Sequence, residues 1–184
     1  MNRKESLVLW FQDITLADVP LVGGKNASLG EMYQNLQKMD IRVPNGFALT
    51  AYAYRYFLKT TGIQKKIQEI LHGLNTRNIN NLSSRGHAIR ALILKTDFPK
   101  DFEEAIVREY KKFGKDMDVA VRSSATAEDL PDASFAGQQE SFLNISGSYE
   151  LLEAVKRCMA SLFTNRAISY REDKKFDHFS IALS

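Results

Sequence analysis

Hydrophobic residues recur with helical spacing along much of the chain. After the glycine pair at 23–24, apolar side chains at Leu29, Met32, Tyr33, Leu36 and Met39 mark one face of a helix. Further helices are predicted over 51–59, 63–74, 80–95 and 99–113, and a last clear one from 148 to about 163. Thr50 and Ser148 are the expected N-caps, and Gly62 is placed to end the second helix. The region of about 51–115 is therefore expected to be a helical, rather basic insertion.

Short apolar runs of β type separate these helices. They cover 7–11, 41–49, 119–121 and 141–145, and a small, polar, loop-like stretch joins the last two. The final residues, 180–184, resemble the first residues of a strand. The mixture predicts an α+β fold, and an end at the entry of a strand suggests part of a longer protein.

Composition excludes several classes of protein. Hydrophobic residues make up 44% of the 184 residues and charged residues 26%, which is typical of a folded globular chain. A single cysteine, Cys158, cannot form an internal disulfide or a cysteine-based zinc site, which favours a reducing, cytoplasmic location. The apolar runs are too short to cross a membrane, and the net charge of +3 comes from mixed basic and acidic residues without a nucleic-acid-binding motif. We expect neither a membrane nor a nucleic acid as partner.

The sequence Gly23-Gly24-Lys25 carries the first candidate chemistry. Two glycines let the backbone approach a bulky anion, the following helix directs its N–H groups there, and Lys25 adds a full charge. The motif is not a Walker A loop, because Val19 and Asn26 stand where glycine and serine or threonine are required. It predicts phosphate binding; the alternative is an ordinary helix N-terminus with a surface lysine.

Arg122 is the second candidate. It follows an apolar strand and precedes two serines, so its guanidinium could bind phosphate oxygens in a fork. Hydrogen-bond donors follow in the next loop, which also contains carboxylates at 128, 129 and 132. Those carboxylates would repel a triphosphate unless they bind a metal, face away or pair with the arginine. A structural ion pair of Arg122 is therefore the alternative.

Other reactive side chains give weaker indications. The three histidines lack metal-binding spacing, and Ser123 and Ser124 lack the nucleophile elbow of serine hydrolases. Cys158 lies in a predicted helix, where packing is expected, although the neighbouring Lys156 and Arg157 could lower its pKa slightly.

Three segments together carry a family resemblance. They are Val22-Gly-Gly-Lys-Asn-Ala-Ser-Leu-Gly-Glu-Met32, Val43-Pro-Asn-Gly-Phe47, and the stretch from Ala120 to Glu140 that contains Arg-Ser-Ser-Ala-Thr-Ala-Glu-Asp-Leu-Pro. They closely resemble the N-terminal nucleotide-binding region of phosphoenolpyruvate synthases, and Leu162 to Arg171 extends the likeness. Pyruvate phosphate dikinase and rifampin phosphotransferase are similar relatives, and the latter is the alternative assignment.

The resemblance implies that residues 1–184 are the N-terminal portion of an ATP-grasp domain, ending before its second lobe. ATP and Mg²⁺ are the implied cofactors, and pyruvate is the implied substrate of domains that this sequence does not contain. By motif position, Lys25 and Arg122 would contact ATP phosphates, while Gly137 and Ser141 would lie in a loop that closes over the nucleotide. The metal ligands and the phosphate-carrying histidine are expected outside the sequence, so it should hold no catalytic residue of its own. A module that keeps this fold only for contact with a partner is the non-enzymatic alternative.

Overall fold

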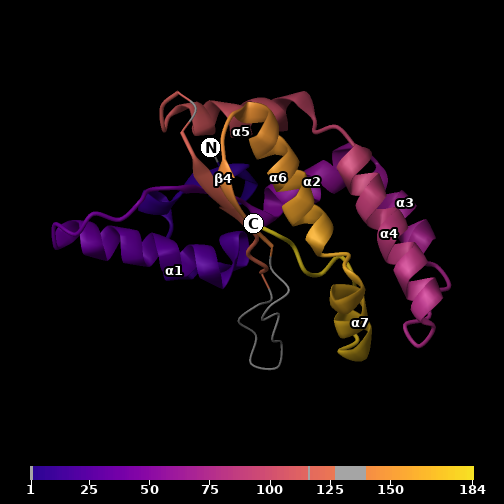
Figure 1. The fold of residues 1–184 in the computed structure, drawn as a ribbon. Coiled ribbons are helices and arrows are strands. Elements are labelled where there is room, and N and C mark those ends of the chain that lie inside the picture. The colour runs from indigo at the N-terminus through magenta and orange to yellow at the C-terminus, as the bar shows by residue number, and fades with distance from the viewer. Residues whose placement is uncertain (1, 116, 127–139) are drawn as a thin grey trace. The chain divides into compact units, whose positions relative to one another are not determined.

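The computed structural model describes residues 2–115, 117–126 and 140–184, which form two compact units. The first unit contains residues 2–55, 124–126 and 182–184, and the second contains 56–115, 117–123 and 140–181. Figure 1 shows helices accompanied by two small antiparallel sheets, which confirms the α+β class. Within the described ranges, no helix combines the length and apolar character needed to cross a bilayer.

The elements follow one another along the chain as helices between short strands. The helices are α1 (Val19–Lys38), α2 (Ala51–Thr60), α3 (Ile63–Leu71), α4 (Ile79–Lys95), α5 (Lys100–Lys111), α6 (Ser148–Ser161) and α7 (Asn165–Asp173). The strands are β1 (Val8–Trp10), β2 (Phe47–Leu49), β3 (Val119–Arg122) and β4 (Ser141–Ile145). Three short 3₁₀ helices, Arg3–Glu5, Phe11–Asp13 and Leu16–Asp18, precede α1.

In the first unit, α1 packs against the segment that precedes it. Gly30 allows this approach, because a Cβ atom there would lie 2.5 Å from the carbonyl oxygen of Ile14. The Gln34 side chain donates a hydrogen bond of 2.6 Å to the same oxygen. Strands β1 and β2 pair with Leu9 opposite Ala48. The core consists of Leu9, Ile14, Val22, Ala27 and Ala48.

A charged side chain holds together the segment that leads into α1. Asp18 precedes the helix and accepts hydrogen bonds from the Arg3 guanidinium and the Thr15 backbone N–H, each 2.8 Å long. The hydrogen bond from Arg3 lowers the pKa of the Asp18 carboxyl, and the bond from Thr15 acts in the same direction. The carboxylate therefore joins the 3₁₀ helix Arg3–Glu5 to the turn of residues 15–18 that leads into α1.

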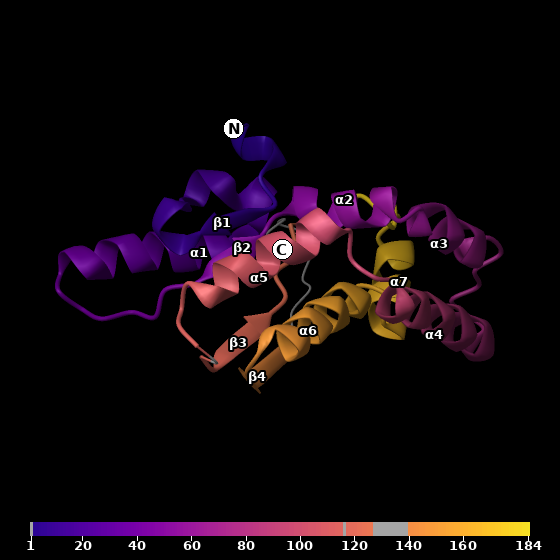
Figure 2. The ribbon, with the colours of Figure 1, turned by 90° about the horizontal axis from the view of Figure 1, so that it is seen from above.

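The second unit is built on helices. Helices α3 and α4 lie side by side in Figure 1, and α6 packs against α4 and against the β3–β4 pair (Figure 2). Phe98 lies between Phe57 and Phe102, with ring centroids 4.9 and 5.1 Å away in edge-to-face geometry.

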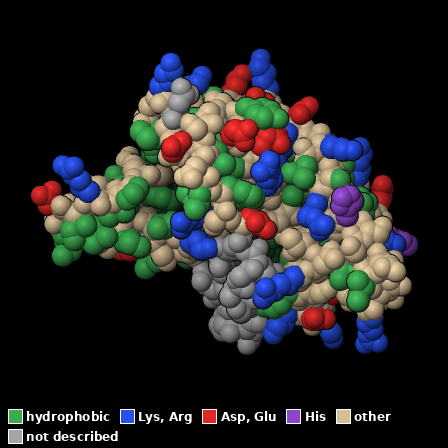
Figure 3. Space-filling model, viewed as in Figure 1, with side chains coloured by type: hydrophobic (Ala, Val, Ile, Leu, Met, Phe, Trp, Pro, Cys, Tyr) green, Lys and Arg blue, Asp and Glu red, His purple; other side chains and the backbone are tan. Residues whose placement is uncertain are grey.

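Basic side chains do not gather in one patch on the face that Figure 3 shows. Lysines and arginines are scattered over it, with acidic side chains among them.

Most helices lie where their hydrophobic spacing predicts, and several details differ. The strand expected over 41–49 is limited to β2, because only residues 47–49 pair with β1. Ser148 is not a cap: Gly147 occupies that position with φ +85°, and its N–H donates to the Tyr110 hydroxyl. Helix α7 has no predicted counterpart, although Thr164 caps it by accepting a hydrogen bond from Ala167.

The environment of Cys158 overturns the expectation for its pKa. The thiol is buried in α6, and burial, together with the charge of Glu140, raises the pKa of Cys158 to about 12. The neighbouring basic residues in the sequence therefore do not activate this thiol.

We predict that the folded chain resists thiol alkylation. At pH 8, a pKa near 12 leaves a thiolate fraction about three orders of magnitude below that of an ordinary cysteine. Iodoacetamide labelling of Cys158, followed by mass spectrometry, should be slow in buffer and fast in urea. Labelling of the folded chain at the rate seen in urea would contradict the burial.

His178 is held in its neutral form near the end of the second unit. Arg171, which is fully buried, donates from Nε to Nδ1 of His178 over 3.0 Å, and Nε2 lies 2.9 Å from Glu172 Oε1. Both contacts fit an imidazole protonated on Nε2 alone. Burial lowers the pKa of His178, and the Arg171 charge lowers it further against the opposing effect of Glu172.

We predict that this histidine makes the fold less stable in mild acid. Because its pKa is lower in the folded state, the unfolded chain binds a proton first as the pH falls below about 6.5, and stability decreases towards the folded-state pKa. Urea unfolding at pH 7.5, 6.5 and 5.5 should show a smaller loss of stability for His178→Gln than for the wild type. The same substitution at the exposed His72 should leave the loss unchanged; equal pH profiles for His178→Gln and the wild type would disprove the assignment.

Candidate functional site

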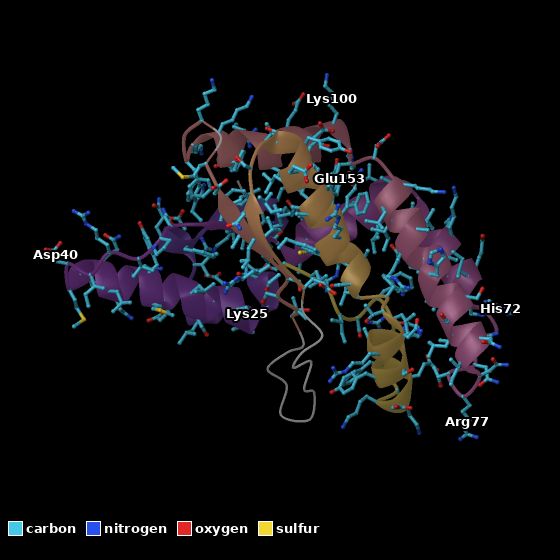
Figure 4. The ribbon with its side chains drawn as sticks, in the orientation of Figure 1. Lys25, Asp40, His72, Arg77, Lys100 and Glu153 are labelled. Carbon is cyan, nitrogen blue, oxygen red and sulfur yellow. The ribbon has the colours of Figure 1, made fainter. Side chains whose placement is uncertain are left out.

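The glycine turn lies inside α1 rather than at its start. The sequence predicted a helix that opens at the glycine pair, but α1 begins at Val19 and is interrupted at Gly23, where φ is +71° and ψ is +161°. The helix resumes directly after Gly23. The glycine pair therefore still lies next to a first turn of helix. Lys25 lies in that turn, half-buried, near the beginning of α1 and far from Asp40 beyond its other end (Figure 4).

Only glycine fits at position 23. Its positive φ is unfavourable for residues with a side chain, and a Cβ atom would lie 2.4 Å from Ser124 Oγ and 2.9 Å from the carbonyl oxygen of Ala125. The turn is therefore pressed directly against the segment 124–126.

The segment 124–126 is paired with the last residues of the chain. Ser124 and Ser184 exchange backbone hydrogen bonds of 2.9 and 2.8 Å, and Thr126 N–H donates to the carbonyl oxygen of Ala182 over 3.0 Å. Ala125 and Leu183 form an isolated antiparallel bridge. The strand-like character expected of the final residues is thus realised as this short pairing, which forms the wall beside Gly23.

Ser124 brings an unusual polar group to this wall. Its side chain is 1% exposed, and within the described part of the chain its hydroxyl has no hydrogen-bond partner. A buried hydroxyl left unsatisfied costs about 1–3 kcal/mol. An unsatisfied donor, a glycine turn and a lysine therefore occur together in the first unit. Ser124 could not be singled out from the sequence, because it lies within a segment that pairs with the distant Ser184.

Arg122 and Ser141 lie opposite each other in the second unit. They are a directly paired couple in the β3–β4 ladder, and both are exposed. The structure thus brings these two predicted residues together and places Ser141 as the first residue of β4. Arg122 forms no ion pair with any carboxylate of the described residues. Gly137 and the three loop carboxylates lie outside the described residues, and Lys25 belongs to the first unit.

Comparison with known proteins shows the family. Residues 19–184 match the family described as "Pyruvate phosphate dikinase, AMP/ATP-binding domain". The chain belongs to this family. The match includes both the Gly23 turn and Arg122, so the two predicted phosphate-binding positions lie within an AMP/ATP-binding domain.

Named relatives agree with this family. The chain is 51% identical over 189 residues to a phosphoenolpyruvate synthase from Aquifex aeolicus and 49% identical over 186 residues to one from Escherichia coli. Both alignments cover all of this chain but only 22% and 24% of those proteins. A probable phosphoenolpyruvate synthase from Methanocaldococcus jannaschii is 47% identical over 182 residues, which is 96% of this chain and 15% of that protein. The chain spans less than a quarter of each of these three relatives.

We predict a large cost for a methyl group at the glycine turn. Gly23→Ala should lower the free energy of unfolding by about 1–3 kcal/mol, because φ +71° with ψ +161° is a conformation essentially restricted to glycine, and by more for the contact with Ser124 and Ala125. Gly62→Ala is the control for a positive φ in open space: Gly62 lies in the left-handed α region with φ +73°, and nothing lies within 4 Å of its Cβ position. Urea denaturation should show the greater loss at position 23. Equal losses would show that the close packing at Gly23 contributes nothing.

Proposed function

We propose that this chain binds the phosphates of ATP at the Gly23 turn, as the nucleotide-binding part of a phosphoenolpyruvate synthase. The observation that carries the proposal is the interruption of α1 at the buried Gly23, followed by Gly24 and Lys25, within an AMP/ATP-binding family. A helix that restarts after a break directs N–H groups and the positive end of its dipole towards an anion. The unsatisfied Ser124 hydroxyl beside the turn adds a further donor.

Lys25 and Arg122 supply the charge in this proposal. Lys25 belongs to the first unit, directly after the glycine turn, and Arg122 belongs to the second unit, at the end of β3. A lysine acts as a compact point charge and an arginine as a two-pronged donor, and together they would neutralise adjacent phosphates. Gly137 and Ser141 belong to the same proposed site as contacts on the nucleotide.

Mg²⁺ is proposed as the ion that accompanies ATP. Among the residues that the structure describes, no group of three His, Cys, Asp or Glu side chains is arranged to bind a metal ion. No step proposed here depends on the ion.

The proposed overall reaction follows from the relatives. ATP, pyruvate and water would give phosphoenolpyruvate, AMP and phosphate, with a histidine of another domain carrying the phosphoryl group. The part of this chain would be to bind and orient the triphosphate and to offset its charge as it changes during transfer. Phosphoryl transfer depends mainly on such positioning and charge stabilisation.

We predict that ATP binding depends on both cations. Isothermal titration of the chain with ATP should show the affinity falling about 10- to 100-fold in Lys25→Ala and in Arg122→Ala, since a hydrogen bond to a charged group contributes about 1.5–3 kcal/mol. Lys38→Ala, an exposed lysine in the last turn of α1, and Arg77→Ala, an exposed arginine, are the matched controls and should bind like the wild type. Unchanged affinity in both test variants would rule out this phosphate site.

A further inference from the structure

Asn26 connects the glycine turn to the end of the chain. It follows Lys25 directly, its side chain is only 9% exposed, and its Nδ2 donates a hydrogen bond of 2.7 Å to Ser184 Oγ. The two residues are 158 positions apart in the sequence. Burying an amide is unfavourable unless its hydrogen bonds are made, so this contact is a specific feature of the fold rather than an incidental one.

Ser184 is itself rigidly held. Both its N–H and its carbonyl oxygen are bonded to the backbone of Ser124, the residue whose side chain touches Gly23. Three segments therefore close on one another: Gly23 packs against Ser124, Ser124 pairs with Ser184, and Ser184 is bonded by Asn26. The first contact is van der Waals packing, the second is backbone pairing, and the third is a side-chain hydrogen bond.

This closed arrangement restrains the part of α1 that follows the break. A glycine with a positive φ is the point of greatest backbone freedom in the helix, and packing against Gly23 alone limits the turn on one side. The Asn26 bond limits it on the other side, one residue beyond Lys25. Among the side-chain hydrogen bonds of the described residues, it is the one that joins residues 23–27 to the paired segments 124–126 and 182–184.

We propose that Asn26 and Ser184 are positioning residues that fix the Gly23 turn, and with it Lys25, in the conformation that binds phosphate. This inference rests on the proposed function, because it assigns no contact with the nucleotide to Asn26 itself. The hydrogen bond would act by pre-organisation: the turn is ordered before the ligand arrives, so binding no longer bears that conformational cost.

The test measures phosphate binding and folding stability side by side. Titrations use ATP and inorganic tripolyphosphate, which reports on the phosphate subsite alone, with Asn26→Ala, Ser184→Ala and the double variant. We expect each single variant to weaken both ligands by about tenfold, the effect of one lost hydrogen bond. The double variant should be no weaker than either, since both changes remove the same bond. Ser184→Thr keeps the hydroxyl and should restore binding.

The matched control is Asn35→Ala, which removes an exposed amide from the same helix. It should leave both affinities unchanged, and urea unfolding of every variant separates loss of fold from loss of binding. ATP binding that needs Lys25 but not Asn26 would overturn the positioning role alone. Additive losses in the double variant, or a loss for ATP without one for tripolyphosphate, would also overturn it. If Lys25→Ala and Arg122→Ala both leave ATP binding unchanged, the proposed function fails first, and this inference fails with it.

Discussion

The contact between Gly23 and the wall formed by Ser124 and Ala125 is the constraint on which the first unit depends. A Cβ at that position would lie inside the van der Waals distance of both neighbours, so the backbone of α1 and the backbone of the wall can meet only through a glycine. Interior packing tolerates little change in volume, which makes such a contact a fixed point for the elements around it. Two other contacts hold the elements around α1: the hydrogen bond from Arg3 to Asp18 just before the helix and the close approach of Gly30 to Ile14.

The same constraint explains why the helix is interrupted rather than simply begun at the glycines. Residues 19–22 are apolar or proline and can continue a helix from its Asp18 start, and Val22 contributes to the core. The chain leaves helical geometry at Gly23, where its backbone meets Ser124 and Ala125. The local pattern predicted a helix that opens at the glycine pair, whereas the helix begins at Val19 and is interrupted four residues later, at Gly23.

Local patterns were sufficient for the elements but not for the contacts between distant residues. Helices α1 to α6 follow from apolar residues three and four apart, a signal contained in each segment. The bond from Asn26 to Ser184 and the pairing of Ala125 with Leu183 join residues that no periodicity relates. Helix α7 was not predicted because its buried face includes an arginine, Arg171, and a search for hydrophobic periodicity counts arginine as polar. The raised pKa of Cys158 depends on burial by neighbours in space, whereas the sequence displays only the lysine and arginine beside it.

The candidate site shows the same division between local and distant information. Lys25 and Arg122 could be selected from the sequence because charge next to a glycine turn or a strand end is itself a chemical signal. The residues that support them carry no such signal. Nothing in the sequence around Ser124 and Ser184 indicates that their backbones pair in the folded chain. Phosphate binding by a flexible glycine turn would require the backbone to be ordered at the moment of binding, at a cost of about 1–2 kcal/mol for each residue fixed. A turn already held by packing on one side and by a buried amide on the other avoids part of that cost. In the proposed site, the uncharged side chains that hold the backbone of Lys25 would therefore contribute to phosphate binding alongside the cations.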